Sequence, residues 1–203
     1  MTDAYRTIRS AASARITRKR SRFLAHLIPV ASLVEAHRAI ERLHKEHHGA
    51  RHICFAYRIH AEPTPLSGSD DAGEPTGSAG LPILQQLERV DLIDVLAAVV
   101  RHFGGVKLGV GGLVRAYSDA VVDAIECAEI SVRSVSVQVE IAFTPDLTAA
   151  VMSTLHRLNA KIDRIEYDAL AHATVTVPPS RAGELTRALR EATGGRAHAE
   201  VKA

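Results

Sequence analysis

The segment that most constrains the fold is residues 99–118, VVRHFGGVKLGVGGLVRAYS. It continues an apolar run that starts at Leu96, and it carries the basic pair Arg101 and His102 where that run ends. A loop rich in glycine follows, and the chain then enters a stretch with apolar residues at helical spacing. The segment therefore predicts a buried strand, a pliant loop and a long helix. The loop glycines are Gly104, Gly105, Gly109, Gly111 and Gly112.

The predicted strand-to-helix junction has the chemistry of an anion-binding site. Lys107 lies in the middle of the glycine loop, and Arg115 is the first charge of the helix. Glycines let a ligand approach the backbone closely, and free N–H groups at a helix N-terminus favour negative charge. We therefore expect Arg101, His102, Lys107 and Arg115 to converge on one anion. Tight turns that need positive φ values are the alternative explanation of the glycines.

The glycine loop fits neither of two known nucleotide-binding patterns. A phosphate-binding loop ends in Gly-Lys followed by Ser or Thr, and a dinucleotide fingerprint has glycines at its first, third and sixth positions. Residues 104–112 contain neither arrangement. The sequence predicts no cofactor.

Alternating apolar residues predict a sheet in the first two thirds of the chain, with the most apolar strand at its centre. Ser32 and Glu35 form a capping box for a helix that runs to about His47. A shorter helix begins near Pro82, and residues 61–79 are expected to form a long loop because they are rich in Pro, Gly, Ser, Asp and Thr. The expected strands are 12–19, 21–29, 53–59 and 92–101, and the expected short helix is 81–89.

The apolar pattern restarts at Val135 with a clean period of two. From there the order strand, helix, strand, strand, helix, strand predicts a ferredoxin-like βαββαβ unit. The chain is therefore expected to form two domains, residues 1–134 and residues 135–203. The expected elements of the second are 135–141, 146–159, 161–168, 171–177, 184–193 and 196–201.

Three further motifs, in order with the glycine segment, resemble the IMPACT/YigZ family. They are KRSRF at 19–23, ARHIC at 50–54 and DAGEPTGSAGLPIL at 71–84. The family usually reads Asp-Asp-Gly-Glu-Pro in the last motif, whereas Ala72 stands here in place of the second Asp. The resemblance spans residues 12–130, and the final third fits by length and pattern alone.

The resemblance implies an α+β fold with two parts. The first is similar to the second domain of ribosomal protein S5, and the second is a small ferredoxin-like domain similar to domain V of elongation factor G. Its function is expected in translation, because the IMPACT side of the family is tied to control of initiation through competition for a kinase activator. The chain is expected to lack the N-terminal extension used for that interaction.

Composition limits the other classes of function. No apolar run approaches the ~20 residues of a membrane span, and the polar N-terminus has no signal-peptide core. The two cysteines, Cys54 and Cys127, give no disulfide framework. The chain is therefore expected to be cytoplasmic, without a membrane partner.

Charge is distributed unevenly along the chain. Residues 1–60 contain twelve Lys or Arg against four Asp or Glu, and residues 61–80 contain four acidic residues and no Lys or Arg. A concentrated basic region attracts polyanions. Aromatic residues are 4% of the chain, with no Trp, so few rings are present on which nucleic-acid bases could stack. A solvated basic arm is the alternative explanation.

Other reactive residues have competing explanations. His44, His47, His48 and His52 are close in sequence, but Gly49 interrupts a helical metal pair, so no metal site is predicted. Cys54 and His52 have the spacing of a nucleophile and a base on one strand face, although a Cys within an apolar strand more often packs in the core. Asp71 and Glu74 are expected to shape their loop by folding against Arg101–Lys107; the alternatives are cation binding or acid–base chemistry.

The leading functional prediction is a translation-associated protein without catalytic activity that binds RNA or a ribosomal surface. Its expected anion-binding residues are Arg51, His52, Arg101, His102, Lys107 and Arg115. One alternative is an enzyme acting on a phosphorylated or carboxylated small molecule at the glycine loop, which a pocket enclosing Glu74, His102 and Lys107 would favour. A further alternative is a protein-interaction module that binds a partner of the translation machinery through the sheet of the second domain.

Overall fold

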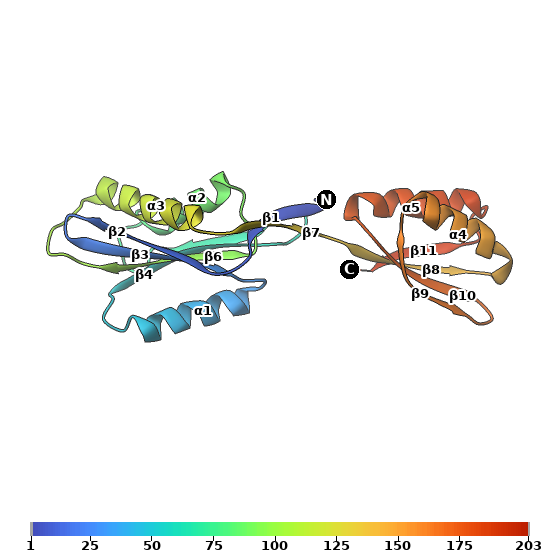
Figure 1. The fold of residues 1–203 in the computed structure, drawn as a ribbon, viewed down its shortest axis with the longest axis horizontal. Coiled ribbons are helices and arrows are strands. Elements are labelled where there is room, and N and C mark those ends of the chain that lie inside the picture. Colours follow the sequence, from blue (N-terminus) through green and yellow to red (C-terminus); the bar gives the residue numbers. More distant parts are fainter. Residues whose placement is uncertain (1, 203) are drawn as a thin grey trace. The chain divides into compact units, whose positions relative to one another are not determined.

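The computed structural model describes residues 2–202. The chain divides into two compact units (Figure 1): residues 5–133 form one, and residues 134–202 with residues 2–4 form the other. Both combine antiparallel strands with helices, as the sequence predicted for an α+β protein. No helix among the described residues is both long enough and apolar enough to cross a membrane.

The first unit is built on a five-stranded sheet with the order β2-β3-β6-β4-β5, and all neighbouring strands are antiparallel. Strand β6 is central and every residue from Val95 to Arg101 is buried, which confirms the predicted position of the most apolar strand. The strands are β2 (Ala12–Arg18), β3 (Ser21–Pro29), β4 (His52–Ile59), β5 (Leu66–Asp70) and β6 (Val95–His102).

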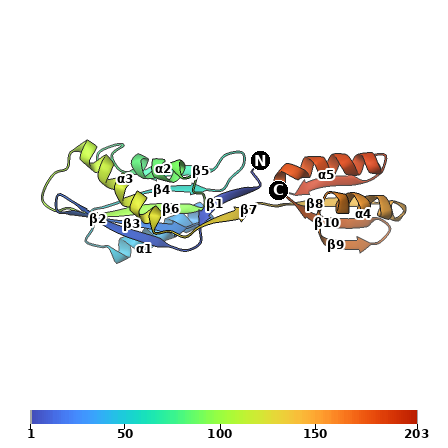
Figure 2. The same cartoon turned by 45° about the horizontal axis from the view of Figure 1, so that its top comes forward.

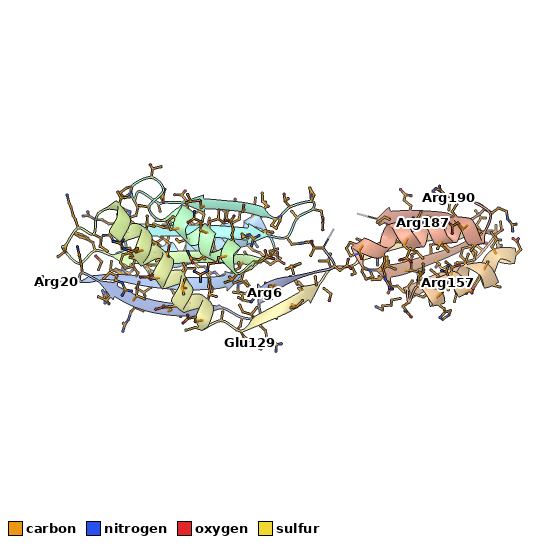
Figure 3. The ribbon with its side chains drawn as sticks, turned by 90° about the horizontal axis from the view of Figure 1, so that it is seen from above. Arg6, Arg20, Glu129, Arg157, Arg187 and Arg190 are labelled. Atoms are coloured by element: carbon orange, nitrogen blue, oxygen red, sulfur yellow. The ribbon has the colours of Figure 1, made fainter. Side chains whose placement is uncertain are left out.

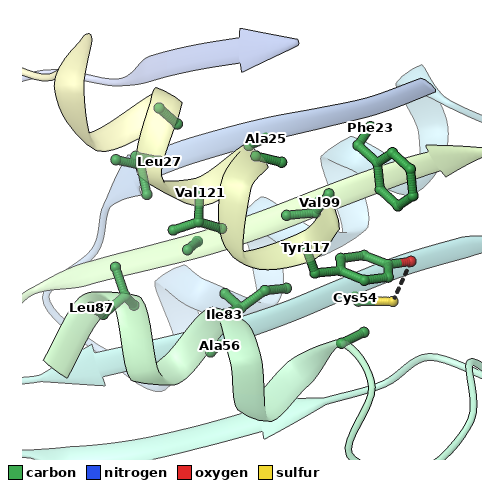
Figure 4. Packing of buried hydrophobic residues seen from close by; sticks show 14 of the residues in the cluster. Phe23, Ala25, Leu27, Cys54, Ala56, Ile83, Leu87, Val99, Tyr117 and Val121 are labelled. Carbon is green, nitrogen blue, oxygen red and sulfur yellow. Dashed lines mark hydrogen bonds between the residues drawn. The ribbon is translucent and has the colours of Figure 1, made fainter. Parts of the chain in front are cut away.

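Helices cover both faces of this sheet (Figure 1; Figure 2). Helices α2 (Gly80–Arg89) and α3 (Val110–Glu126) lie on one face, and α1 (Leu33–Glu46) lies on the other. Alternate residues of each strand face opposite sides of a sheet, so β6 sends Ala97 and Val99 toward α2 and α3, and Ala98 and Val100 toward α1. Figure 4 shows the core beneath α2 and α3.

The first turn of α1 confirms the predicted capping box. Ser32 Oγ accepts a hydrogen bond from the Glu35 backbone N–H at 3.2 Å, and Glu35 Oε2 accepts one from the Ala31 N–H at 2.7 Å. The first bond satisfies an N–H group that the helix leaves free, and the second holds the residue before the cap against the first turn.

The expectation of a continuous loop over residues 61–79 is wrong, because β5 lies within it and pairs with β4. Its sequence, LSGSD, has little intrinsic preference for strand structure. Gly68 stands opposite Tyr57, and a Cβ at position 68 would lie 2.4 Å from the tyrosine Oη. The glycine is therefore a site of close packing between strands rather than a turn.

Two strands at the ends of the first unit were not predicted. β1 (Ala4–Ile8) and β7 (Ile130–Ser134) form a two-stranded sheet. The buried carboxylate of Asp94 fixes both, since it accepts hydrogen bonds from Tyr5 Oη and, at 3.0 Å, from Arg133 Nη1. This pairing joins residues far apart in sequence, so local patterns carry little sign of it.

The second unit has the predicted element order, and its four-stranded antiparallel sheet has the order β11-β8-β10-β9. Both of its long helices pack against one face of this sheet. The helix expected at 184–193 begins earlier, because Pro179 occupies its first turn, where proline is well tolerated. The elements are β8 (Val137–Phe143), the 3-10 turn η1 (Pro145–Leu147), α4 (Thr148–Arg157), β9 (Lys161–Tyr167), β10 (Ala171–Val177), α5 (Pro179–Ala192) and β11 (His198–Lys202).

Candidate anion-binding site

A cavity of about 950 Å³ opens in the first unit where the glycine loop meets the sheet. Four Arg or Lys side chains against one carboxylate leave its lining with an excess of three positive charges. Such an excess in a concave site attracts anions more strongly than the same charges on a flat surface. The titratable residues that line it are Arg22, Arg51, His52, Glu74, Arg101, His102 and Lys107.

The strand register brings most of these side chains to one end of the sheet. His102 pairs with Arg22 of β3, and Arg101 pairs with His52 of β4. Lys107 comes from the loop between β6 and α3, and Arg51 directly precedes β4. Three antiparallel strands and one loop thus position the basic groups of the cavity.

Arg101 does not offer the cavity a free charge. Its Nη1 lies 2.6 Å from Oε1 of Glu74, and the two side chains are only 8% and 4% exposed. Tyr117 Oη donates a second hydrogen bond to the same oxygen at 2.9 Å. The loop that carries Glu74 is therefore folded against Arg101, as the sequence analysis expected of the acidic loop.

Aromatic rings enclose the Arg101 guanidinium. Its Cζ lies 5.6 Å from the ring centre of buried Phe23 and 5.5 Å from that of Phe103, both within cation–π distance. The Nε of Arg101 is buried and makes no hydrogen bond to any residue in the described range. Arg101 therefore stabilises the fold of the site rather than binding a ligand directly.

Asp71 holds the acidic loop in shape. Its carboxylate accepts hydrogen bonds from the backbone N–H groups of Gly77, Ala79 and Gly80, at 2.7–2.9 Å, and so caps the N-terminus of α2. Burial acts to raise the pKa of Asp71, but the three N–H groups outweigh it and the pKa lies below its usual range. Ala72 adopts a φ of +46°, a left-handed conformation that Asp tolerates better than Ala.

The Cys54–His52 pair is not arranged as a nucleophile and a base. Cys54 Sγ is buried and lies within hydrogen-bond distance of two acceptors, the Asp71 carbonyl oxygen at 3.0 Å and Tyr117 Oη at 3.3 Å (Figure 4). Burial raises the pKa of the Cys54 thiol to about 12. The His52 Nδ1 is instead hydrogen-bonded to the carbonyl of Ala72, at 2.8 Å. Cys54 therefore packs in the core, and His52 binds the loop.

The histidines near the end of α1 form no metal centre within residues 2–202, where no three His, Cys, Asp or Glu side chains are placed to share an ion. His47 instead lies between His26 and His102, with ring centres 5.7 and 6.2 Å away. The pKa of His102 is lowered by burial, by Arg22 and by His47. His102 therefore favours its neutral form in the cavity wall.

Arg115 does not line the cavity that holds the other predicted residues, and its side chain is exposed on α3. The helix begins at Val110, so Gly111 and Gly112 are helical rather than part of the loop. At about 100° per residue, Arg115 lies roughly 160° around the helix from Leu113, which faces the cavity.

Three of the other loop glycines have specific backbone roles. Gly105 and Gly109 have φ values of +85° and +72°, and Gly109 directly precedes α3. At Gly104, a Cβ would lie 2.1 Å from the carbonyl carbon of Arg20, in the turn between β2 and β3. Gly104 therefore allows the basic hairpin turn to pack against the glycine loop.

Sequence reasoning missed Arg22 and Phe103 as residues of the cavity. Arg22 lies in the KRSRF motif, but its place beside His102 depends on the register of β3 against β6. That register follows from a two-residue turn at Lys19 and Arg20, both with positive φ. Lys and Arg do not favour positive φ, so the sequence does not predict this turn. Phe103 lies between Arg101–His102 and the glycines, where the apolar period of the strand has ended.

Comparison with known proteins agrees with this architecture. The Impact N-terminal domain matches residues 19–125, and a domain of unknown function (DUF1949) matches residues 141–196. A crystal structure of a hypothetical protein superimposes with a TM-score of 0.69 at 26% identity, covering 98% of this chain and 97% of that one.

Named relatives occur in bacteria and mammals. IMPACT family member YvyE of Bacillus subtilis is 42% identical over 60% of this chain, and the match spans about half of that relative, 55%. Protein IMPACT of Rattus norvegicus is 37% identical over 46% of this chain and 30% of its own length. IMPACT family member YigZ of Escherichia coli is 30% identical over 87% of both chains. The chain belongs to the IMPACT family.

Proposed function

We propose that this chain is a translation-associated protein that binds RNA, free or on a ribosomal surface, through the cavity at the glycine loop. It acts by occupying its partner rather than by catalysis. The observation that carries the proposal is the convergence of Arg22, Arg51 and Lys107 on one cavity in which the only carboxylate, Glu74, is already paired with Arg101. The chain belongs to the IMPACT family, and the resemblance to that family is what implies the connection to translation.

Phosphate is the anion that this charge pattern suits best. Arginine presents a planar fork of donors that matches phosphate oxygens, and lysine adds a compact positive charge. Arg22, Arg51 and Lys107 are exposed, so an approaching phosphate meets charges that are not already neutralised. The N-terminus of α3 adds to this field, because the first turn of the helix contains no acidic residue.

The basic surface continues beyond the cavity, which favours a polymer over a small anion. The turn at Lys19 and Arg20 packs against Gly104, and Arg20 marks its tip in Figure 3. Arg22 belongs to the cavity lining and lies two residues from this tip. A strand of RNA held at the cavity would therefore meet further positive charges along the hairpin.

The test is equilibrium binding of short single-stranded RNAs of different sequence, measured by fluorescence anisotropy. The site variant Arg22→Ala/Arg51→Ala should bind all of them more weakly and to a similar extent, because phosphate contacts carry no sequence information. The control variant Arg157→Ala/Arg190→Ala removes two exposed arginines from α4 and α5 (Figure 3) and should bind as the unmodified chain does. Equal weakening by both variants, or by neither, would contradict the proposed site.

A second candidate function is an enzyme acting on a phosphorylated small molecule, and one observation favours it. The cavity encloses Glu74, His102 and Lys107, the arrangement that the sequence analysis associated with catalysis. The lowered pKa of His102 favours the neutral imidazole, which can accept a proton. Conversion of a phosphorylated compound that is abolished in His102→Gln, with RNA binding retained, would support the enzyme.

We also propose that the two units are independent domains meeting near residue 134. The first would resemble the second domain of ribosomal protein S5, and the second would be ferredoxin-like. The strand order β11-β8-β10-β9 supports the second assignment, since it places the first and third strands of a βαββαβ unit at the centre. Limited proteolysis should leave an N-terminal fragment that ends near residue 134. A first cut within residues 5–133, or well inside the second unit, would contradict the boundary.

A further inference from the structure

The cavity has an exposed apolar rim beside its basic wall. Phe103 and Val110 line the cavity and are each 56% exposed, and Val106, 40% exposed, lies between them in the glycine loop. Single exposed apolar residues are ordinary, but a group of them beside a charged cavity marks a ligand with an apolar part. An inorganic anion would leave this rim in contact with water.

Phe103 is an exposed ring that already makes a cation–π contact inside the cavity. The Arg101 guanidinium contacts both Phe23 and Phe103, with its Cζ 5.6 and 5.5 Å from the two ring centres. Phe23 is fully buried, whereas Phe103 is 56% exposed and is the one Phe or Tyr among the described residues that line the cavity. A flat ring laid on Phe103 would cover its exposed aromatic surface.

We propose that the cavity takes one unpaired nucleotide of an RNA strand, with its base stacked on Phe103 and its phosphate among Arg22, Arg51 and Lys107. This inference rests on the proposed function and adds the form of RNA that is recognised. A base within a duplex has neighbours on both of its faces, so only an unpaired and unstacked nucleotide presents a free face to Phe103. Stacking accepts every base, which agrees with binding that is not selective for sequence.

The competing explanation gives Phe103 a structural role as a cover over the Arg101–Glu74 pair. Both explanations predict that Phe103→Ala has an effect, so binding must be measured by a signal that reports contact with a base. The chain contains no Trp, so the residue introduced by Phe103→Trp is the single tryptophan fluorophore of that variant. A stacked base quenches this fluorescence, and a phosphate alone leaves it unchanged.

The experiment titrates Phe103→Trp with a short single-stranded RNA, with the same oligomer lacking its bases, with its duplex and with free AMP. We expect quenching and tight binding with the single-stranded RNA, weaker binding without quenching for the abasic oligomer, and no quenching by the duplex. Quenching by the duplex, or an equal response to AMP and to the RNA strand, would overturn the proposal of an unpaired nucleotide within a strand.

Two truncations complete the test. Phe103→Ala should weaken binding of single-stranded RNA by between about fivefold and 150-fold, the usual range for loss of one stacked base, and leave the abasic oligomer unaffected. Val110→Ala removes an equally exposed apolar side chain that cannot stack, and it should have a much smaller effect. If RNA binding stays steeply dependent on salt while Phe103→Ala binds normally, the stacking inference fails and the proposed function stands. If no RNA binds the unmodified chain, both fail.

Discussion

Arg101 and Glu74 form a buried ion pair in the wall of a basic cavity, with 2.6 Å between Nη1 and Oε1. The pair joins the end of the central strand β6 to the loop before α2. Because each charge neutralises the other, the net positive charge of the cavity comes from Arg22, Arg51 and Lys107. The pair therefore builds the cavity, and its exposed neighbours are free to bind.

The first prediction concerns the stability of this pair. Glu74→Gln should lower the free energy of unfolding by about 3–5 kcal/mol, because the Arg101 charge would remain buried without a counter-charge. Denaturant unfolding followed by circular dichroism measures this difference. The double variant Glu74→Gln/Arg101→Met removes both charges and should recover part of the loss. A single variant as stable as the unmodified chain would show that the pair contributes nothing to the fold.

The second prediction concerns the contact between the glycine loop and the basic hairpin. Gly104→Ala should destabilise the first unit and shift the hairpin turn, since its Cβ would lie 2.1 Å from the Arg20 carbonyl carbon. Gly111→Ala is the matched control, because a Cβ there meets nothing within 4 Å and alanine favours the helix by about 1 kcal/mol. Thermal unfolding should separate the two, with a lower Tm for the first and an equal or higher Tm for the second. Equal Tm values would contradict the close approach.

The third prediction concerns the two thiols. Cys54 is buried with a pKa raised to about 12, whereas Cys127 is exposed at the end of α3. The thiolate is the reactive form, so iodoacetamide at neutral pH should label Cys127 in the folded chain and reach Cys54 only after unfolding. Mass spectrometry of tryptic peptides identifies the labelled residue. Rapid labelling of Cys54 in the folded chain would contradict its place in the core.

The fourth prediction concerns pH. Burial and the neighbouring His47 lower the pKa of His26, and Glu46 opposes them only partly, so His26 binds a proton more readily in the unfolded chain than in the folded one. The free energy of unfolding should therefore fall as the pH decreases from the usual histidine pKa of 6.5 toward the lowered value. His102 adds a dependence of the same sign.

Urea unfolding between pH 7.5 and 5.5 tests this dependence. In His26→Leu the decline over this range should be shallower, and the remaining slope should come chiefly from His102. A decline as steep as that of the unmodified chain would show that His26 does not experience the buried environment described for it.

Local patterns in the sequence predict the elements that depend on local physics. The apolar run before Arg101 predicts β6 because a strand buried on both faces needs no alternation. Ser32 and Glu35 predict the start of α1 because the capping motif is local and lies within a few residues of the helix start. In contrast, β5 contains Ser67, Gly68 and Ser69, and it exists because Tyr57 and its neighbours in β4 offer it a partner.

The residues of the candidate site also fall into two groups, those that the local sequence predicts and those that it does not. Arg101, His102 and Lys107 lie in one short segment, and the sequence predicts their proximity. Arg22 reaches the cavity because β3 pairs with β6. Phe103 reaches it because of the path that the chain takes after β6 ends. Sequence spacing predicts neither position. Arg115 was expected in the site because it is the first charge of the helix after the glycine loop, but it lies on a face of α3 away from Leu113, which lines the cavity.

The most direct test of the central claim is the dependence of RNA affinity on salt concentration. For a single-stranded RNA, each phosphate contact contributes about 0.7 to the slope of log affinity against log salt. The slope of Arg22→Ala/Arg51→Ala should therefore be shallower than that of the unmodified chain by about 1.4, and Arg157→Ala/Arg190→Ala should keep the original slope. An affinity that does not change with salt, or a slope left unaltered by the loss of Arg22 and Arg51, would contradict the assignment of this cavity as a phosphate-binding site.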